Sequence, residues 1–459
     1  MSHPHSSTNV PAGKTTESIA PYERTEDRAW PPVGRFAFRA LLIYFLLLIS
    51  RSPHKIHIPF LSPWIYAAWR KIAPWVGEHI LDIQGEMYLG FAGSGDRTFD
   101  YTQVFICAVI AAVGAAIWSL LDRKPRAHRT TARWLVVVCR YYLGITMLTY
   151  GLTKVIKTQF PFPSLERLVT LYGDLAPMRL LWTYMGYSAP YTIFVGFGEI
   201  VGGLLMFFNR TRTIGAAVLI AVLGNIVVIN FSYGVPAKLY SVHLFLMALA
   251  ILMLDVRRLI GVFLLNRPTP PADLRPLFAT RWMNVTGKLL GMGLVAWKLY
   301  TIVPSIWSHY HEFGDGRERP PLWGVHEVES FVHDGDPLPP LLDDPVRWRG
   351  LIIDRPLSTG EFPGRVAIWH MDGSIERYPI ELDVDGQTMT FLSQDVTTLS
   401  DGSRVREPVD VLRFERPSPD ELLLQGTWQG KDVEIRLRER DLPLIQHEFH
   451  WIQERPPGR

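Results

Sequence analysis

Long apolar stretches dominate the first two thirds of the chain. Seven of them fall before Pro304, and none of comparable length follows it. A helix needs roughly 20 apolar residues to cross a bilayer, so these stretches predict about seven membrane-spanning helices whose ends extend by a few residues. The expected spans are Phe36–Ser50, Thr102–Leu121, Trp134–Val155, Tyr191–Phe208, Thr213–Ile229, Leu239–Leu254 and Val285–Ile302.

After Pro304 the pattern changes to short runs of alternating polarity. Turn pairs such as Asp372-Gly373 and Asp385-Gly386 separate the runs, which is typical of β-hairpins. About eight such strands predict a small antiparallel barrel or sandwich. The expected strands are Trp348–Asp354, Gly364–His370, Ser374–Leu382, Gln387–Leu392, Val409–Phe414, Glu421–Trp428, Asp432–Arg438 and His447–Gln453.

The expected fold is therefore an α-helical polytopic membrane bundle followed by an all-β antiparallel domain. Within the first long loop, Ile58–Leu81 is rich in Trp and Pro and predicts a re-entrant or interfacial helix, or a surface helix packed on the bundle. The predicted parts are a disordered arm (1–33), a helix pair with a long loop (34–131), a four-helix core (132–260), a loop with the last span (261–310), a linker with little core (311–345) and the β domain (346–459).

Charge is distributed unevenly and predicts the orientation. Of the 47 basic and 44 acidic residues, residues 1–310 carry 30 and 15, which leaves 17 and 29 for the rest. The loop 122–133 carries five Lys and Arg, and later alternate loops carry Arg210 with Arg212 and Arg257 with Arg258. Basic loops stay cytoplasmic. We therefore expect a cytoplasmic N-terminus and an acidic β domain on the extracytoplasmic side.

Several familiar signatures are missing from the sequence. The two cysteines, Cys107 and Cys139, lie inside apolar stretches, so no disulfide framework is expected. His243 is the only histidine in a predicted span, which argues against a bis-histidine haem. No metal cluster, phosphate loop or dinucleotide fingerprint is present, and neither a metal site nor nucleic-acid binding is predicted.

Polar residues inside the spans are the candidate chemistry, because burying them in a membrane is costly. With the predicted orientation they fall at or above the midplane on the extracytoplasmic side. Together they would orient a polar headgroup, a quinone oxygen or a proton path. These candidate ligand-binding residues are Lys154, Glu199, Asn225, Asn230 and His243.

Structural explanations compete with this interpretation. Lys154 would snorkel to the interface, Asn230 would cap its helix, and Glu199 and His243 would satisfy one another. Asp96, in the glycine-containing loop before the second span, is a further ligand-binding candidate, whereas Asp100 is better explained as a helix cap.

Small residues recur at a spacing of four on two spans. Gly198 with Gly202 and Gly287 with Gly291 form GxxxG pairs, which allow neighbouring helices to approach closely. They indicate packing rather than chemistry.

At this point the sequence resembles a known family. The resemblance covers roughly Ala132–Leu254 and rests on Arg140-Tyr141-Tyr142-Leu143-Gly144, Tyr150-Gly151-Leu152-Thr153-Lys154, Gly198-Glu199 with Gly202-Gly203, and Arg212. These motifs are similar to those of DoxX-like bacterial membrane proteins. The whole chain resembles a longer DoxX-like group with an extra N-terminal helix pair and a C-terminal β domain ending in an aromatic motif, here Phe449-His450-Trp451-Ile452-Gln453-Glu454.

The resemblance implies a multi-pass protein of the bacterial inner membrane with a four-helix core. The family takes its name from a subunit of a thiosulfate:quinone oxidoreductase, and other members are linked to membrane-associated redox defence. It therefore favours an accessory or quinone-interacting subunit, with a quinone as the candidate cofactor.

Two other hypotheses stay open. One is a non-catalytic membrane anchor, transport or assembly factor that binds a membrane or periplasmic protein through exposed edge strands of its β domain. The other is an enzyme acting at the outer leaflet, because the layout also resembles vitamin K-dependent carboxylase-like proteins. Lys154 would then be the candidate base.

Overall fold

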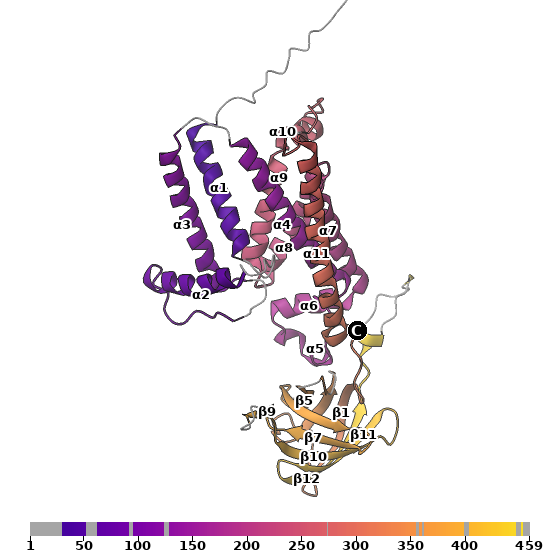
Figure 1. The fold of residues 1–459 in the computed structure, drawn as a ribbon. Coiled ribbons are helices and arrows are strands. Elements are labelled where there is room, and N and C mark those ends of the chain that lie inside the picture. The colour runs from indigo at the N-terminus through magenta and orange to yellow at the C-terminus, as the bar shows by residue number, and fades with distance from the viewer. Residues whose placement is uncertain are drawn as a thin grey trace, which may run out of the picture. The chain divides into compact units, whose positions relative to one another are not determined.

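The computed structural model describes residues 30–51, 62–90, 95–123, 128–272, 274–354, 358–359, 362–398, 404–446 and 451–452. The chain divides into two compact units (Figure 1). Unit 1 contains residues up to Phe91 and Arg97–Cys139, and unit 2 contains Ala92–Asp96 and all residues from Arg140 onward.

Six described helices are long and apolar enough to cross a membrane. A seventh span results if α9 (Lys238–Met253) and the bent segment Val256–Leu264, which makes an angle of 67° with it, count as one. Each predicted span coincides with one of these helices to within a few residues at most ends. The six are α1 (Pro32–Ser50), α3 (Thr98–Leu121), α4 (Arg129–Val155), α7 (Ala189–Met206), α8 (Arg212–Ser232) and α11 (Arg281–Phe313).

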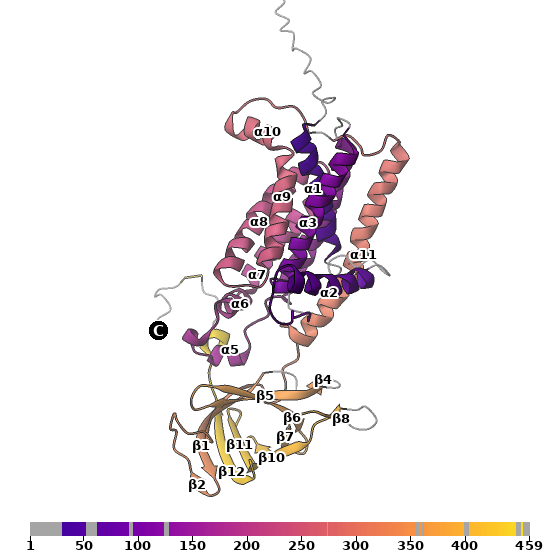
Figure 2. The same ribbon diagram turned by 90° about the vertical axis from the view of Figure 1, so that its left-hand side faces the viewer.

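Unit 1 consists of α1, α2 (Ser62–His79), α3 and the start of α4. Helices α1 and α3 lie side by side, and α2 runs across them at a steep angle (Figures 1 and 2). Trp69 of α2 packs against Phe99 of α3, whereas Trp64 and Trp75 are 77% and 55% exposed. The sequence thus predicted a helix here correctly, and its position at a membrane interface stays a prediction.

Unit 2 begins with four helices that form a ring of contacts. α7 packs on α8 and α8 on α9. The hydroxyls of Tyr142 in α4 and Tyr240 in α9 lie 3.1 Å apart, and glycines join α4 to α7. The connection from α4 to α7 contains three short helices that the sequence did not predict. They are α5 (Leu165–Val169), η2 (Tyr172–Asp174) and α6 (Pro177–Tyr187).

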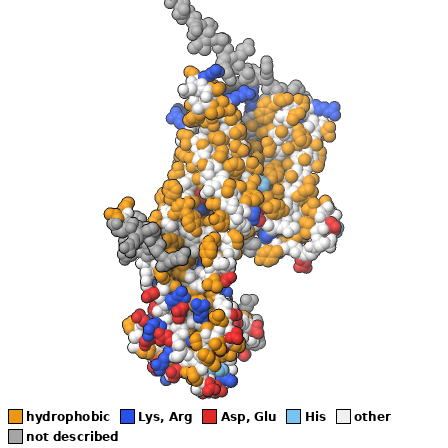
Figure 3. All heavy atoms as spheres, turned by 180° about the vertical axis from the view of Figure 1, so that it is seen from behind, with side chains coloured by type: hydrophobic (Ala, Val, Ile, Leu, Met, Phe, Trp, Pro, Cys, Tyr) orange, Lys and Arg blue, Asp and Glu red, His pale blue; other side chains and the backbone are white. Residues whose placement is uncertain are grey.

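After α9, the helices α10 (Val256–Leu259) and η3 (Ile260–Leu264) lead towards α11. Only 6% of the residues in the apolar part of α11 are buried, and the others are exposed or half-buried. In Figure 3, hydrophobic side chains cover the visible surface of the helices, and charged side chains gather over the β domain. Such an apolar exterior is what a lipid environment requires.

The β domain is a closed antiparallel barrel of eight strands. Neighbours follow the order β1-β3-β5-β6-β7-β10-β11-β12, and β12 pairs with β1 to close the ring. The eight barrel strands are β1 (Gly324–His333), β3 (Trp348–Ile353), β5 (Phe362–His370), β6 (Ile375–Asp383), β7 (Thr388–Leu392), β10 (Pro408–Glu415), β11 (Glu421–Trp428) and β12 (Lys431–Glu439). The short strands β2 (Asp336–Pro337), β4 (Ser358–Thr359), β8 (Thr397–Thr398) and β9 (Arg404–Val405) and the helix α12 (Pro443–Gln446) complete the domain.

The barrel interior is filled by side chains. Trp348 is fully buried and makes edge-to-face contacts with Phe331 and Trp428, and Phe391 packs against both tryptophans. Alternate residues along β10 point inward and outward, as the period-two pattern predicted. Among the described residues, the barrel interior is therefore a packed hydrophobic core.

Two details of the predicted β domain need correction. The segment 311–345, predicted to be a linker, contains β1, a full strand of the barrel. Its register shifts between Val328 and Ser330, and this irregularity breaks the alternation that marks a strand. The expected strand His447–Gln453 lies largely outside the described residues, and Trp451 and Ile452 are not in a strand. Because β12 pairs with β1, the eight barrel strands form a closed ring. These strands therefore lack the exposed edges that were expected to bind a partner protein.

Candidate functional site

Helices α4 and α7 approach closely because glycines face one another. A Cβ on Gly151 would lie 2.7 Å from the carbonyl oxygen of Gly196, and one on Gly203 would lie 2.9 Å from that of Gly144. The two contacts are separated by seven residues, or two helical turns, on each helix. The backbones therefore meet at two points, and no larger side chain fits at either without moving a helix.

The predicted GxxxG pair on α7 serves a different neighbour. A Cβ on Gly198 would lie 3.4 Å from Val222 of α8, and one on Gly202 would clash with Leu219 of the same helix. On α11, Gly291 sits against the ring of Tyr141 in α4. The small residues of α7 thus hold two helices at once, α4 on one side and α8 on the other.

Lys154 and Glu199 form an ion pair between α4 and α7. The Nζ of Lys154 lies 2.8 Å from Oε1 of Glu199 and donates to Oε2 at 3.0 Å. The carboxylate is fully buried and the lysine side chain is 7% exposed. The pair lies one turn from the Gly151–Gly196 contact, so the close approach of the helices brings the two side chains together.

The ammonium group of Lys154 also contacts a second residue, Gln159. It donates to Oε1 of Gln159 at 3.0 Å, and the rings of Tyr150 and Phe160 lie 5.6 and 6.0 Å away. Gln159 also accepts a hydrogen bond from Thr153 at 3.3 Å. Gln159 forms part of the wall of a cavity of about 500 Å³ between the α4–α7 connection, the end of α11 and the barrel. The pair is therefore connected to a cavity through one amide.

Asn230 and His243 make contacts elsewhere in the bundle. Asn230 is buried and donates to Ser241 at 3.0 Å and to the carbonyl of Ala237 at 3.3 Å, so it holds the turn between α8 and α9. The Nδ1 of His243 lies 2.6 Å from the carbonyl oxygen of Leu239 in its own helix. These contacts favour the structural explanation for Asn230.

Asn225 shows where the expected convergence was wrong. Its side chain is exposed on the outer surface of α8, so it faces away from the four-helix core. The sequence places Asn225 on a helix that is apolar on all sides, which leaves the buried face undetermined until packing is known.

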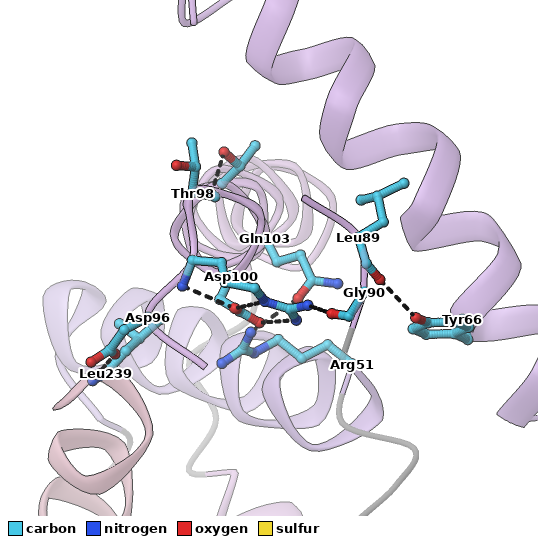
Figure 4. A network of polar contacts seen from close by, with 11 residues as sticks. Arg51, Tyr66, Leu89, Gly90, Asp96, Thr98, Asp100, Gln103 and Leu239 are labelled. Carbon is cyan, nitrogen blue, oxygen red and sulfur yellow. Dashed lines mark hydrogen bonds and ion pairs between the residues drawn. The ribbon is translucent and has the colours of Figure 1, made fainter. Parts of the chain in front are cut away.

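Asp96 caps a helix that is distant in the sequence. Its carboxylate accepts from the backbone N–H groups of Lys238 and Leu239, each at 2.8 Å (Figure 4). It also lies 3.4 Å from the Nζ of Lys238. The residue before α9 supplies no side-chain cap of its own. Asp96 therefore satisfies the free amides at the start of α9, and its role as a ligand-binding residue stays a prediction.

A second polar network lies within unit 1 (Figure 4). Asp100 accepts from the backbone N–H of Arg97 at 3.1 Å and from its guanidinium at 2.8 Å, which supports the expected capping role of Asp100. Arg51, at the end of α1, donates to Gln103 of α3 at 3.1 Å, and both are buried. These contacts tie the end of α1 to the start of α3.

Two buried arginines were missed in the sequence. Arg140 in α4 donates to the carbonyl of Met206 at 2.8 Å, and also contacts Asn209, where α7 ends. Arg39 in α1 is 1% exposed and lies 3.1 Å from Asp122 and 3.0 Å from Ser119. Both lie inside or beside apolar runs. Their position among apolar residues was the signal that would have identified them.

Asp255 organises the other end of the core. It accepts from Thr213 at 2.6 Å and from Arg258 at 2.9 Å, and Arg212 lies 3.6 Å away. The arginines expected in basic loops are thus partly used to join α8 to the segment after α9. Within the described ranges, no group of three His, Cys, Asp or Glu side chains is arranged to hold a metal ion.

Fold and site define a multi-pass membrane protein with a four-helix core, a buried Lys–Glu pair and a C-terminal β-barrel. The model of the family "Methylamine utilisation protein MauE" matches residues 132–238, the greater part of this core. The chain is also 30% identical over 153 residues to "Uncharacterized protein YwoB" of Bacillus subtilis (strain 168). That alignment covers 31% of this chain and 92% of the Bacillus protein.

The chain therefore belongs to the same family as YwoB. The family model that matches is MauE rather than a DoxX-like model, although it covers nearly the segment where the DoxX resemblance was noted. No solved structure matches the chain.

Proposed function

We propose that this protein is an accessory membrane protein of a redox system and that its core binds a small polar headgroup beside Lys154 and Glu199. A quinone is the expected ligand class. The observation that carries the proposal is the position of the Lys154 ammonium, which is shared between buried Glu199 and Gln159 in a cavity wall.

Energetics favour a function for the pair over a purely structural role. Transferring two charges out of water costs several kcal/mol per ion, and apolar replacements of similar volume are often neutral or stabilising. The contact between α4 and α7 already rests on two glycine pairs. Close packing of this kind holds helices together in a membrane without an ion pair.

The hydrogen bonds of Lys154 suit an acceptor that enters from the cavity. A lysine ammonium has three donors, and here one goes to Glu199 and one to Gln159. A ligand carbonyl that displaces the oxygen of Gln159 would receive the same hydrogen bond. The negative charge of Glu199 would keep the ammonium charged while the ligand is bound. Quinone carbonyls are acceptors of this kind.

The matching family adds support at a coarser level. The name of the MauE family ties it to methylamine utilisation, and the match lies on the four helices that hold the pair. A membrane protein that assists an oxidative pathway is consistent with that name. The reaction itself and its partners are part of the proposal only.

For localisation we propose a bacterial inner membrane, with a cytoplasmic N-terminus and an extracytoplasmic barrel. The basic loops support this orientation. Within unit 2, the end of α4 and the barrel also lie on one side, since Leu165 donates to Asp354 and Lys157 lies 2.8 Å from Asp315. A cysteine at the exposed barrel position Ser330, in a Cys107→Ala/Cys139→Ala background, should react with an impermeant thiol reagent in intact spheroplasts. Reaction only after lysis would contradict this orientation.

A second candidate function is that of an anchor or assembly factor that binds a protein through the barrel. The observation in its favour is that the barrel interior is packed while its surface is richly charged (Figure 3). A partner would then dock on side chains rather than on strand edges. Crosslinking of exposed barrel positions to a defined protein would support this candidate.

The redox proposal is tested by quinone-linked electron flow in membranes that contain wild type, Glu199→Gln or the control Glu327→Gln. Glu327 undergoes the same chemical change on the barrel surface, where it pairs with Arg440. Flow should fall in Glu199→Gln and persist in the control. Equal flow in all three membranes at equal protein levels would refute the proposal.

A further inference from the structure

The cavity beside Gln159 has chemistry that the Lys154–Glu199 pair does not use. Its volume of about 500 Å³ lies in the range of small-molecule sites. The wall combines three arginines, two aspartates and four aromatic rings. These charged and aromatic residues are Arg167, Arg317, Arg319, Asp315, Asp354, Phe162, Trp182, Phe313 and Trp323.

Both carboxylates of the cavity already have cationic partners. Asp315 lies 2.8 Å from the Nζ of Lys157 and accepts from the backbone of Phe162 at 2.6 Å. Asp354 accepts from Arg317 at 2.7 Å and from the backbone of Leu165 at 3.3 Å. Neither carboxylate is therefore free to neutralise the remaining arginines.

Arg167 and Arg319 are the two remaining arginines of this wall. Within the described part of the chain, neither has a carboxylate at ion-pair distance, and the guanidinium of Arg319 lies 4.1 Å from the ring centre of Trp323. Glu166, next to Arg167, is used by Arg377 at 2.6 Å. Burial and then the neighbouring Arg179 lower the pKa of Arg167, and the neighbouring Glu166 opposes this shift. An anion beside Arg167 would offset its repulsion from Arg179.

The aromatic residues give the same cavity an apolar side. Trp182 packs on Phe160 of the α4–α7 connection, and Phe313 is the last residue of α11, a helix long enough to span. Aromatic residues such as tryptophan at the ends of spanning helices are typical of the interfacial zone, where lipid headgroups meet acyl chains. A ligand that is anionic at one end and apolar at the other matches both sides.

We propose that this cavity binds the phosphate headgroup of an anionic membrane lipid, with Arg167 and Arg319 as its phosphate ligands and the aromatic wall against its glycerol and first methylene groups. Guanidinium groups bind phosphate with paired, charge-assisted hydrogen bonds, which makes arginine the suited residue type. The proposal goes beyond the redox function, because its phosphate ligands are Arg167 and Arg319 instead of Lys154 and Glu199, while the quinone of the proposed function would enter through the same cavity.

The test measures lipid binding to the full-length protein by native mass spectrometry. The probes are phosphatidylglycerol, phosphatidylcholine and glycerol 3-phosphate, each titrated into delipidated protein. The variants are Arg167→Gln/Arg319→Gln, the charge-preserving Arg167→Lys/Arg319→Lys, and the control Arg365→Gln/Arg413→Gln, which removes two exposed arginines from the barrel.

Wild type and the barrel control should retain one phosphatidylglycerol more tightly than phosphatidylcholine. The glutamine double variant should bind it on the order of tenfold or more weakly, since hydrogen bonds to charged groups are lost. The lysine variant should bind with intermediate affinity. Unfolding temperatures measured without lipid check that all variants are folded.

Two outcomes would overturn the proposal. Equal phosphatidylglycerol binding by wild type and the folded glutamine variant would exclude the arginines as ligands. Binding of glycerol 3-phosphate as tight as that of the lipid would refute a lipid source and assign the site to a soluble phosphate. Because Glu199→Gln leaves this cavity's arginines in place, failure here and failure of the redox proposal are distinguishable.

Discussion

Removing one member of the Lys154–Glu199 pair should destabilise the core more than removing both. Lys154→Met leaves a buried carboxylate without its ammonium partner, and Glu199→Met leaves the ammonium with only Gln159. The double variant replaces both charges with unbranched apolar side chains between two helices that glycines already hold together.

The magnitudes follow from the burial of the pair. Breaking a buried ion pair by removing one partner costs roughly 3–5 kcal/mol, whereas replacing the whole pair by apolar residues is neutral or stabilising by roughly 1–4 kcal/mol. Glu199 is fully buried and Lys154 nearly so, which places this pair in that regime. The interaction energy from the double-mutant cycle should therefore be at least about 3 kcal/mol, above the range of an exposed pair.

The assay is reversible unfolding of the full-length protein in mixed micelles, followed for wild type, both single variants and the double variant. The singles should lose stability, and the double variant should return to within about 1 kcal/mol of wild type or exceed it. If the losses of the two single variants simply add in the double variant, the two side chains are not coupled and the reasoning fails.

Three further predictions concern packing, capping and pH. Gly151→Ala should lower the free energy of unfolding by roughly 1–3 kcal/mol because its Cβ meets the backbone of α7. The control Gly293→Ala has open space around the new Cβ and should be neutral or slightly stabilising. Both variants are compared by unfolding in micelles, and equal effects would argue against the close approach of α4 and α7. Asp96→Ala should cost about 1 kcal/mol and speed hydrogen exchange at the start of α9, and unchanged exchange there would contradict the capping role. Burial lowers the pKa of His326 in the barrel below its ordinary value of 6.5, so the unfolded barrel binds the proton more readily. The contribution of His326 to barrel stability is then complete above pH 6.5 and is lost as the pH falls through the lower pKa of the folded state. Hydrogen exchange of the barrel strands should lose this pH dependence in His326→Gln. An identical pH profile in the variant would exclude His326 as the source of the dependence.

The spanning helices were predictable because apolar length decides them. Their interior chemistry was only partly predictable. Lys154 and Glu199 meet as expected, since Glu199 is the one charged residue in its span and the glycine-rich faces of α4 and α7 come together. Asn225 was misplaced because α8 is apolar on every side, and the rotation of such a helix depends on its neighbours.

Other features depend on contacts between distant parts of the chain. The role of Asp96 as a cap for α9 requires a contact across 142 residues of sequence, for which no local pattern exists. The strand β1 has the sequence character of a linker because its register shift and the surrounding proline and acidic residues hide its alternation. The short helices α5 and α6 were not predicted either, since too few residues are available for a clear period.

The most direct test of the central claim is extraction of lipids and quinones from the purified protein, followed by native mass spectrometry of wild type and Glu199→Gln. Our account predicts a stoichiometric quinone in wild type that is lost or strongly reduced in Glu199→Gln, with the same lipid content in both. A wild-type protein without any quinone, or equal quinone in both, would contradict a ligand site at the Lys154–Glu199 pair.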